Sequence, residues 1–187
     1  GKTGGQVYNQ FPVRLAMTHY ALDGRQYDPE QAWADWKYFL RKDTDSSASG
    51  TALSTGVKIK MKAMAIDPEG HRLFHITDRF ENLGKSTGVV TSVMWCYATP
   101  ASFSAHNVSR NNYGQIAREM IEDSRLDVIM GCGHPWFDNS GKPRAAGRYK
   151  FFGGDSLWRA IVEGRAGGDC DGDGEPDEWI ESAYRRL

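Results

Sequence analysis

The stretch TDSSASGTALSTGVK, from Thr44 to Lys58, carries the clearest structural signal in the chain. Asp45 or Ser46 can cap a helix, because a short side-chain oxygen accepts hydrogen bonds from the free N–H groups of the first turn. The small residues that follow let the helix pack closely against a neighbouring element, and Gly56 marks its end. The stretch therefore predicts a short, tightly packed helix.

The start of this helix also predicts an anion site. A helix N-terminus carries partial positive charge and unpaired N–H donors, so a phosphate or sulfate fits there beside a serine hydroxyl. An ordinary capped helix without a ligand explains the same composition. These residues alone leave both alternatives open.

The order of residues in this stretch resembles the nucleophile motif of the alkaline phosphatase family, with Ser46 at the position of the serine that becomes phosphorylated. Two more stretches are similar to the family at the expected spacing. They are YATPASFSAHNVSR at 97–110 and LDVIMGCGHP at 126–135. With PVRLAMTHY at 12–20, the resemblance covers most of the chain.

The rest of the pattern predicts alternating helices and strands. Apolar and β-branched runs at 87–94 and 126–130 are typical of buried strands, and 112–122 is expected to be a helix between them. Such a unit favours a parallel sheet. The resemblance implies the same α/β class, as a portion of a three-layer α/β/α sandwich with a mostly parallel sheet. Further helices are predicted at 29–41, 73–83 and 156–162, the last capped by Asp155.

Residues 1–187 are expected to form a single partial domain of this fold. Within it, 135–187 is expected to be a surface excursion, because 139–154 is rich in Gly, Lys and Arg without a clear period. In the family, one metal-binding Asp precedes the matched region, and the zinc-binding Asp and His residues follow it. The sequence contains no replacement for them, so we expect an internal fragment of a longer phosphatase, or one piece of a divided chain, that is inactive on its own.

The resemblance implies hydrolysis of phosphate monoesters through a phosphoserine intermediate. Ser46 is the implied nucleophile, and its oxygen is an implied zinc ligand. Arg110 would clamp two phosphate oxygens, because a guanidinium is planar and permanently charged. Asp45 would help to hold that arginine, and Asp45, Ser47 and Arg110 together form the implied substrate-binding site. Lys62 stands where the family has a turn glycine.

A third metal site, normally for Mg²⁺, is implied at Thr99. Its partner position carries Tyr97, where the family usually has Asp or His. Because a neutral phenol is a poor ligand for Mg²⁺, we expect this site to be altered, weakened or empty. The implied cofactors are therefore Zn²⁺ and Mg²⁺, with most of their ligands outside this chain.

The stretch DCDGDGEPD at 169–177 resembles the first part of a calcium-binding loop, in which acidic residues alternate with small ones. Ile180 occupies the position of the glutamate that normally closes such a loop. A structural Ca²⁺ site and a solvated acidic turn both remain open. The candidate ligands are Asp169, Asp171, Asp173 and Asp177.

The histidines permit two simple predictions. His71 and His75 are four residues apart and could share one helix face as a metal pair, although no third ligand lies nearby in the sequence. His106 falls within a matched motif, but not at a metal-ligand position. We expect it to be a buried, hydrogen-bonded imidazole.

Charge and hydropathy narrow the classes of partner. The net charge of −1, without a long basic run, argues against nucleic-acid binding. No apolar stretch approaches the roughly 20 residues that cross a bilayer. The start GKTGGQVYNQ lacks a signal-peptide pattern, so either a signal was removed or the natural N-terminus lies elsewhere. The resemblance implies a periplasmic or extracellular location, and a homodimer as the assembly.

Three functions remain open from the sequence, and the phosphatase segment is favoured. A related metal-dependent enzyme acting on diesters or sulfates is a second reading, against which Arg110 argues, because a clamp for two free oxygens suits a monoester. The third is a noncatalytic, calcium-stabilised binding or structural module, in which Tyr97 marks decay of the site.

Overall fold

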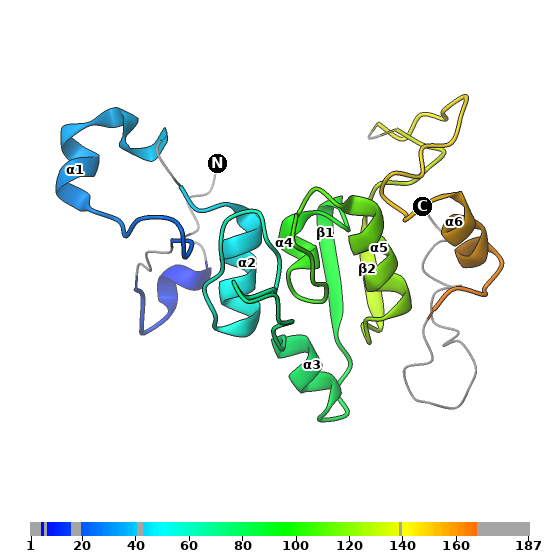
Figure 1. Cartoon of the computed structure of the whole chain (residues 1–187), viewed down its shortest axis with the longest axis horizontal. Helices are drawn as coiled ribbons and strands as arrows, with labels where there is room; N and C mark the ends of the chain where they lie inside the picture. Colours follow the sequence, from blue (N-terminus) through cyan, green and yellow to red (C-terminus); the bar gives the residue numbers. More distant parts are fainter. Residues whose placement is uncertain (1–4, 6, 16–19, 41–42, 139, 168–187) are drawn as a thin grey trace.

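Figure 1 shows the computed structural model of the chain, which describes residues 5, 7–15, 20–40, 43–138 and 140–167. The described residues form short helices and a small parallel sheet, as expected for part of an α/β fold. In chain order the elements are the 3₁₀ helix η1 (Val7–Gln10), α1 (Pro29–Ala34), the 3₁₀ helix η2 (Trp36–Leu40), α2 (Ser46–Thr55), α3 (Ile76–Glu81), β1 (Gly88–Met94), α4 (Ala98–Ala101), α5 (Tyr113–Glu122), β2 (Val128–Cys132) and α6 (Asp155–Val162).

The sheet confirms the predicted βαβ unit. β1 and β2 pair in parallel, with Val89 opposite Ile129, and α4 and α5 lie between them in the chain. The ladder is irregular between Val90 and Met94, where the partner of Met94 is Cys132. Both strands therefore end at the same edge of the sheet, which is where α/β proteins place their ligands.

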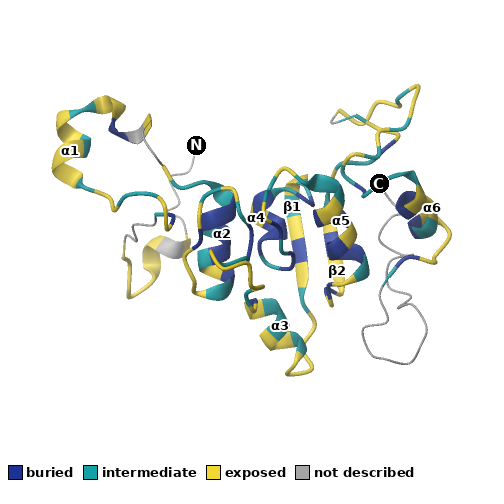
Figure 2. Ribbon diagram, in the orientation of Figure 1, coloured by how far each residue is buried: buried dark blue, intermediate teal, exposed yellow. Residues whose placement is uncertain are grey.

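One face of this sheet is buried and the other is exposed. Val89 and Ile129 belong to the main core together with apolar side chains of α5 and α6. Val90, Val128 and Met130 alternate with them, and these three are 73%, 42% and 48% exposed. Figure 2 shows β1 mostly exposed or intermediate, with Val89 buried between exposed neighbours. The described residues thus cover one side of the sheet, which agrees with a portion of a layered fold.

The predicted helix of the 44–58 stretch is confirmed as α2. Asp45 caps its start, and Gly56 ends it in the left-handed conformation with φ of 75°. Gly50 lets α2 approach α4 closely, because a Cβ atom at this position would lie 2.0 Å from Ser102 Oγ. Figure 1 shows α2 beside α4, which in turn lies against β1.

The prediction of one helix over 29–41 is wrong, because the helix is interrupted at Asp35. This residue is extended, and its carboxylate accepts a hydrogen bond from the N–H of Lys37 at 3.0 Å. Such a local bond competes with helix continuation. Trp33 and Trp36, on either side of this break, are 90% and 75% exposed.

The helix expected over 73–83 is shorter, because it begins after His75. The N–H of His75 donates to Asp78 Oδ2 at 2.7 Å and forms a capping box. Leu73 instead pairs in an extended manner, with its N–H donating to the carbonyl of Ala65 at 2.9 Å. His71 lies before the helix and is bonded to Asp67, so the two histidines do not form a pair on one helix face.

The stretch expected to be a surface excursion also contributes to the core. Phe152 is 1% exposed and packs with the buried side chains of α6. Asp155 is the first residue of α6 and not its cap, which is Gly154. The acidic stretch at 169–177 lies outside the described residues. Among the helices that the structure describes, none has the length and apolar character that a membrane span requires.

Candidate active site

The carboxylate of Asp45 organises the start of α2. Its Oδ1 atom accepts the N–H of Ala48 at 3.1 Å, which is the helix cap. Its Oδ2 atom accepts three further hydrogen bonds, from the Ser47 hydroxyl at 2.7 Å, the Lys62 N–H at 3.2 Å and a guanidinium nitrogen of Arg110 at 3.1 Å. One side chain therefore ties together segments that are far apart in the sequence.

These contacts set the charge of the site. Burial raises the pKa of Asp45, but the hydrogen bonds from Ser47, Ala48, Arg110 and Lys62 lower it by more, so the pKa of the carboxyl lies below its ordinary value. Asp45 is thus an anion at neutral pH and a firm partner for the Arg110 cation.

Arg110 is held by its backbone as well as by its side chain. Its N–H donates to the carbonyl of Lys62 at 2.7 Å, next to an antiparallel bridge between Met64 and Asn107. Its side chain is 28% exposed, and only one guanidinium nitrogen is bonded to Asp45. A guanidinium has five N–H donors, so others can bind an oxyanion.

Ser46 is the first residue of α2 and lies directly beside the Asp45–Arg110 pair. The first intrahelical bond runs from the Ser49 N–H to the Asp45 carbonyl at 3.0 Å. The N–H groups of Ser46 and Ser47 precede that bond, as is usual in the first turn, so they can face an anion. Ser46 is partly exposed, and its hydroxyl is bonded to no other residue that the structure describes.

The side chain of Ser47, which the resemblance implies in substrate binding, faces Asp45. Ser47 is fully buried, and its hydroxyl donates to Asp45. A substrate cannot reach this hydroxyl without breaking that bond. The side chain instead supports the carboxylate that holds Arg110.

Lys62 also belongs to the site, although the sequence alone assigned it no role. Its N–H donates to Asp45 and its carbonyl accepts from Arg110, so its backbone joins the two charged groups. Its φ is 70°, in the left-handed region that costs a residue with a side chain roughly 1–2 kcal/mol. The glycine that the family places here was the available signal, because glycine adopts this conformation without strain.

Tyr97 and Thr99 lie shortly after the end of β1, at the start of α4. Tyr97 caps α4, and its ring packs 5.3 Å from that of Tyr113 and 5.7 Å from that of Phe151. Thr99 is exposed within α4. Neither residue supplies a carboxylate, so this pair does not fit Mg²⁺. Across the described residues, no group of three or more His, Cys, Asp or Glu side chains is arranged to hold a metal ion.

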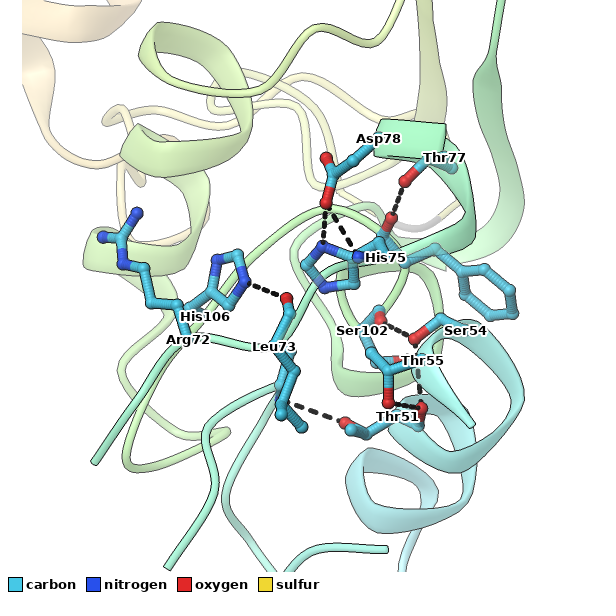
Figure 3. Close-up of polar contacts among 12 residues, drawn as sticks. Thr51, Ser54, Thr55, Arg72, Leu73, His75, Thr77, Asp78, Ser102 and His106 are labelled. Atoms are coloured by element: carbon cyan, nitrogen blue, oxygen red, sulfur yellow. Dashed lines mark hydrogen bonds and ion pairs between the residues drawn. The ribbon is translucent and has the colours of Figure 1, made fainter. Parts of the chain in front are cut away.

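Buried polar contacts fix α2 against its neighbours, as Figure 3 shows. The Ser54 hydroxyl donates to the carbonyl of Ser102 at 2.5 Å and so joins α2 to the end of α4. The Thr51 hydroxyl accepts the N–H of Ala65 at 3.0 Å. The helix that carries Ser46 is therefore held on two sides.

His106 is hydrogen-bonded, as the sequence predicted, but it is only partly buried, with a side chain that is 12% exposed. Its Nδ1 atom lies 2.8 Å from Glu119 Oε1, and its Nε2 atom lies 2.8 Å from the carbonyl oxygen of Leu73. The His75 ring packs against it with centroids 4.5 Å apart (Figure 3). His106 thus connects α5 to the segment before α3. It lies four residues before Arg110 in the chain.

Known proteins with similar sequences are alkaline phosphatases. A sequence profile of the alkaline phosphatase family matches residues 6–158. Alkaline phosphatase 4 of Bacillus subtilis is 40% identical over 100 residues, which are 51% of this chain and 22% of the relative. Alkaline phosphatase of Escherichia coli K12 is 31% identical over 144 residues, which are 67% of this chain and 28% of the relative.

Solved structures agree with this relationship. The cold-active alkaline phosphatase of a Shewanella species superposes with a TM-score of 0.51 at 36% identity, over 64% of this chain and 26% of that protein. The enzyme of Thermus thermophilus gives a TM-score of 0.50 at 30% identity, over 65% and 24%. The matched part of this chain thus spans about a quarter of the length of these relatives. On the profile match and on these similarities, the chain belongs to the alkaline phosphatase family.

Proposed function

We propose that this chain carries the nucleophile and the phosphate clamp of a phosphomonoesterase, in which Ser46 becomes phosphorylated. One observation carries the proposal. The carboxylate that caps the helix starting at Ser46 also holds Arg110, at 3.1 Å. The carboxylate of Asp45 thus connects a fixed cation to the helix start that carries the Ser46 hydroxyl.

This arrangement suits a terminal phosphate. Two oxygens of a monoester can accept from the guanidinium of Arg110, while a third faces the N–H groups of the first turn of α2. A diester offers only two non-bridging oxygens, so it loses one of these contacts. The geometry therefore favours monoesters over diesters as the substrate class.

The reaction has two displacements at phosphorus. In the first, the Ser46 oxygen forms a bond to phosphorus, the bond from phosphorus to the alcohol oxygen breaks, and the departing alcohol gains a proton as the serine loses one. In the second, water attacks the phosphoserine, releases phosphate and restores the hydroxyl. Arg110 and the helix start stabilise the charge on the phosphoryl oxygens throughout.

Ser46 needs activation that the described residues do not supply. Asp45 is a weak base because its pKa is lowered, and its oxygens are occupied by other donors. The family resemblance assigns this activation to Zn²⁺, which lowers the pKa of a bound hydroxyl. Because the described residues offer no zinc coordination sphere, we assign the remaining Zn²⁺ and Mg²⁺ ligands to the part of the relatives that this chain does not span.

Three further assignments belong to the same proposal. We place the protein in the periplasm or outside the cell, as part of a homodimer. We expect the magnesium site at Thr99 to be weakened by Tyr97. A structural Ca²⁺ at Asp169, Asp171, Asp173 and Asp177 stays a prediction, because these residues lie outside the described part of the chain.

Turnover by the longest natural protein that contains these residues tests the proposal. With Zn²⁺ and Mg²⁺ present, Ser46→Ala should lower kcat for 4-nitrophenyl phosphate by on the order of a thousandfold or more. Ser49→Ala is the matched control, because Ser49 lies one turn further along α2 and should keep activity. The 187-residue chain alone should be inactive.

Three outcomes would contradict the proposal. Full activity in Ser46→Ala would exclude this serine as the nucleophile. Faster turnover of bis(4-nitrophenyl) phosphate than of the monoester would favour a diesterase. Absence of any turnover in the long natural protein would instead favour the noncatalytic derivative.

A further inference from the structure

A cavity opens at the edge of the sheet where both strands end. Its volume is about 380 Å³, and its lining includes Met94, the last residue of β1, and Gly133, which directly follows β2. The residues around Asp45 do not line it. It is therefore a different site from the candidate active site.

One wall of the cavity is apolar. Met94 and Phe151 face each other across Gly133, whose φ is 118°. A Cβ atom on Gly133 would lie 3.3 Å from Phe151 Cβ and 3.5 Å from Met94 Cγ. The glycine thus keeps this side of the cavity open, and a flat apolar group fits against the phenyl ring.

The lining also includes two basic residues, Arg144 and Arg148. The N–H of Arg144 donates to the carbonyl of Trp136 at 2.8 Å, and that of Arg148 donates to the carbonyl of Pro135 at 3.1 Å. The Arg144 side chain is also fixed, because its Nε donates to the carbonyl of Phe137 at 2.9 Å. The two cations are thus held on a paired stretch of backbone.

Asp138 offsets part of this charge, because the pKa of its carboxyl is lowered by the N–H groups of Lys142 and Ser140 and also by the charge of Arg144. Its Oδ1 atom accepts the N–H groups of Ser140 at 2.8 Å and Lys142 at 2.9 Å, so the carboxylate serves the turn that it begins. Among the described lining residues, two arginines face one carboxylate. The cavity is therefore net positive.

His134 adds a neutral donor. Its Nδ1 atom accepts the N–H of Trp136 at 3.1 Å, which places the proton of the neutral ring on Nε2. Burial lowers the pKa of His134, and its ring packs 5.0 Å from that of Trp158. At neutral pH the histidine contributes an N–H without further charge.

We propose that this cavity binds a small organic anion, with its phosphate, phosphonate or carboxylate group at Arg144 and Arg148 and its apolar body against Phe151 and Met94. The proposal goes beyond the phosphoserine chemistry of Ser46 and stands independently of it. The same chemistry could belong to the leaving group of a substrate or to a separate molecule.

Titration of the 187-residue chain with phenylphosphonate, whose P–C bond resists hydrolysis, tests this site. Trp136 and Trp158 contact residues of the cavity wall and provide a fluorescence signal, with calorimetry as the second readout. We expect saturable binding that weakens at least tenfold in Arg144→Gln/Arg148→Gln. Inorganic phosphate carries only the anionic group, and benzyl alcohol carries only the apolar ring. Both should therefore bind more weakly than phenylphosphonate.

Three variants make the test decisive. Arg118→Gln is the matched control, because this arginine is bonded to Glu122 and Gly153 outside the cavity, and it should bind like the wild type. Arg148→Gln alone should also weaken binding, which guards against misfolding of the double variant. Arg110→Gln distinguishes binding at the candidate active site, where phenylphosphonate can also bind, from binding in the cavity.

The proposal is overturned if phenylphosphonate does not saturate, or if its binding is lost in Arg110→Gln and kept in the double variant. An equal loss in Arg118→Gln would also overturn it, because this result indicates unspecific charge attraction. In the long natural protein, a higher KM of the double variant only for substrates with a second anionic group would identify the leaving group as the ligand. An unchanged KM together with lost phenylphosphonate binding would identify a separate molecule.

Discussion

At the scale of single residues, the carboxylate of Asp45 accepts hydrogen bonds from two neighbours in its own helix and from two distant segments. The cap was predictable, because Asp before a run of small residues favours a helix start. The bonds from Lys62 and Arg110 were not predictable from local sequence, since they depend on how the chain returns to the helix. The family motif indicated Arg110, and only the structure indicated the Lys62 backbone.

The lowered pKa of Asp45 predicts a pH dependence of stability. A carboxyl whose pKa is lower in the folded state stabilises the protein fully above its unfolded-state pKa, and this contribution is lost as the pH falls through the folded-state value. Asp45→Asn keeps a helix cap but removes the charge, so its unfolding free energy should fall less steeply over that acidic window. Urea midpoints measured against pH test this.

Asp45→Ala separates the cap from the charge. The Asp45→Ala variant should lose about 1 kcal/mol more unfolding free energy than Asp45→Asn at neutral pH, because alanine cannot accept a hydrogen bond from the Ala48 N–H. Equal slopes for the wild type and Asp45→Asn would show that the Asp45–Arg110 pair contributes nothing to acid stability.

At the scale of elements, sequence periodicity predicted some helices well and others poorly. The expected helix at 112–122 is α5, which begins one residue later, at Tyr113, and ends at Glu122 as expected. The helix expected over 29–41 breaks where the Asp35 side chain bonds to the Lys37 N–H. The helix expected from 73 starts late because the Leu73 carbonyl is needed by His106, 33 positions later. Periodicity reports which residues are apolar and does not report such competing bonds.

The packing of α2 on α4 predicts an unusual response at Gly50. Glycine to alanine in a helix normally stabilises by about 1 kcal/mol. Here the new methyl group would meet Ser102 Oγ at 2.0 Å and Ser102 Cβ at 3.0 Å, so Gly50→Ala should destabilise by roughly 1–3 kcal/mol. Urea unfolding of the chain measures this change.

Ser102→Gly supplies the matched partner, because it removes both atoms that the methyl group would meet. The double variant should be more stable than the sum of the two single changes predicts, which is the signature of a direct contact. Simple additivity, or a stabilising Gly50→Ala, would contradict the close approach of α2 and α4.

At the scale of the whole molecule, the motifs predicted the family and the parallel α/β class, and both are confirmed. Motifs succeed here because the serine, arginine and aspartate of a reaction centre must keep their order and spacing. The aromatic packing of Tyr97 with Tyr113 and Phe151 was not predictable, since it joins the end of β1 to a loop more than 50 residues later. Phe151 of the same loop also lines the cavity at the end of the sheet.

The central claim is that Ser46, and not a neighbouring serine, receives the phosphoryl group. The direct test is acid quenching of the longest natural protein during turnover of 4-nitrophenyl phosphate, followed by peptide mass spectrometry. We predict one phosphoryl group on Ser46, absent from Ser46→Ala, because Ser47 is fully buried against Asp45 and Ser49 lies a turn further along α2. A phosphoryl group on Ser47 or Ser49, or an active enzyme that carries none on this peptide, would contradict the claim.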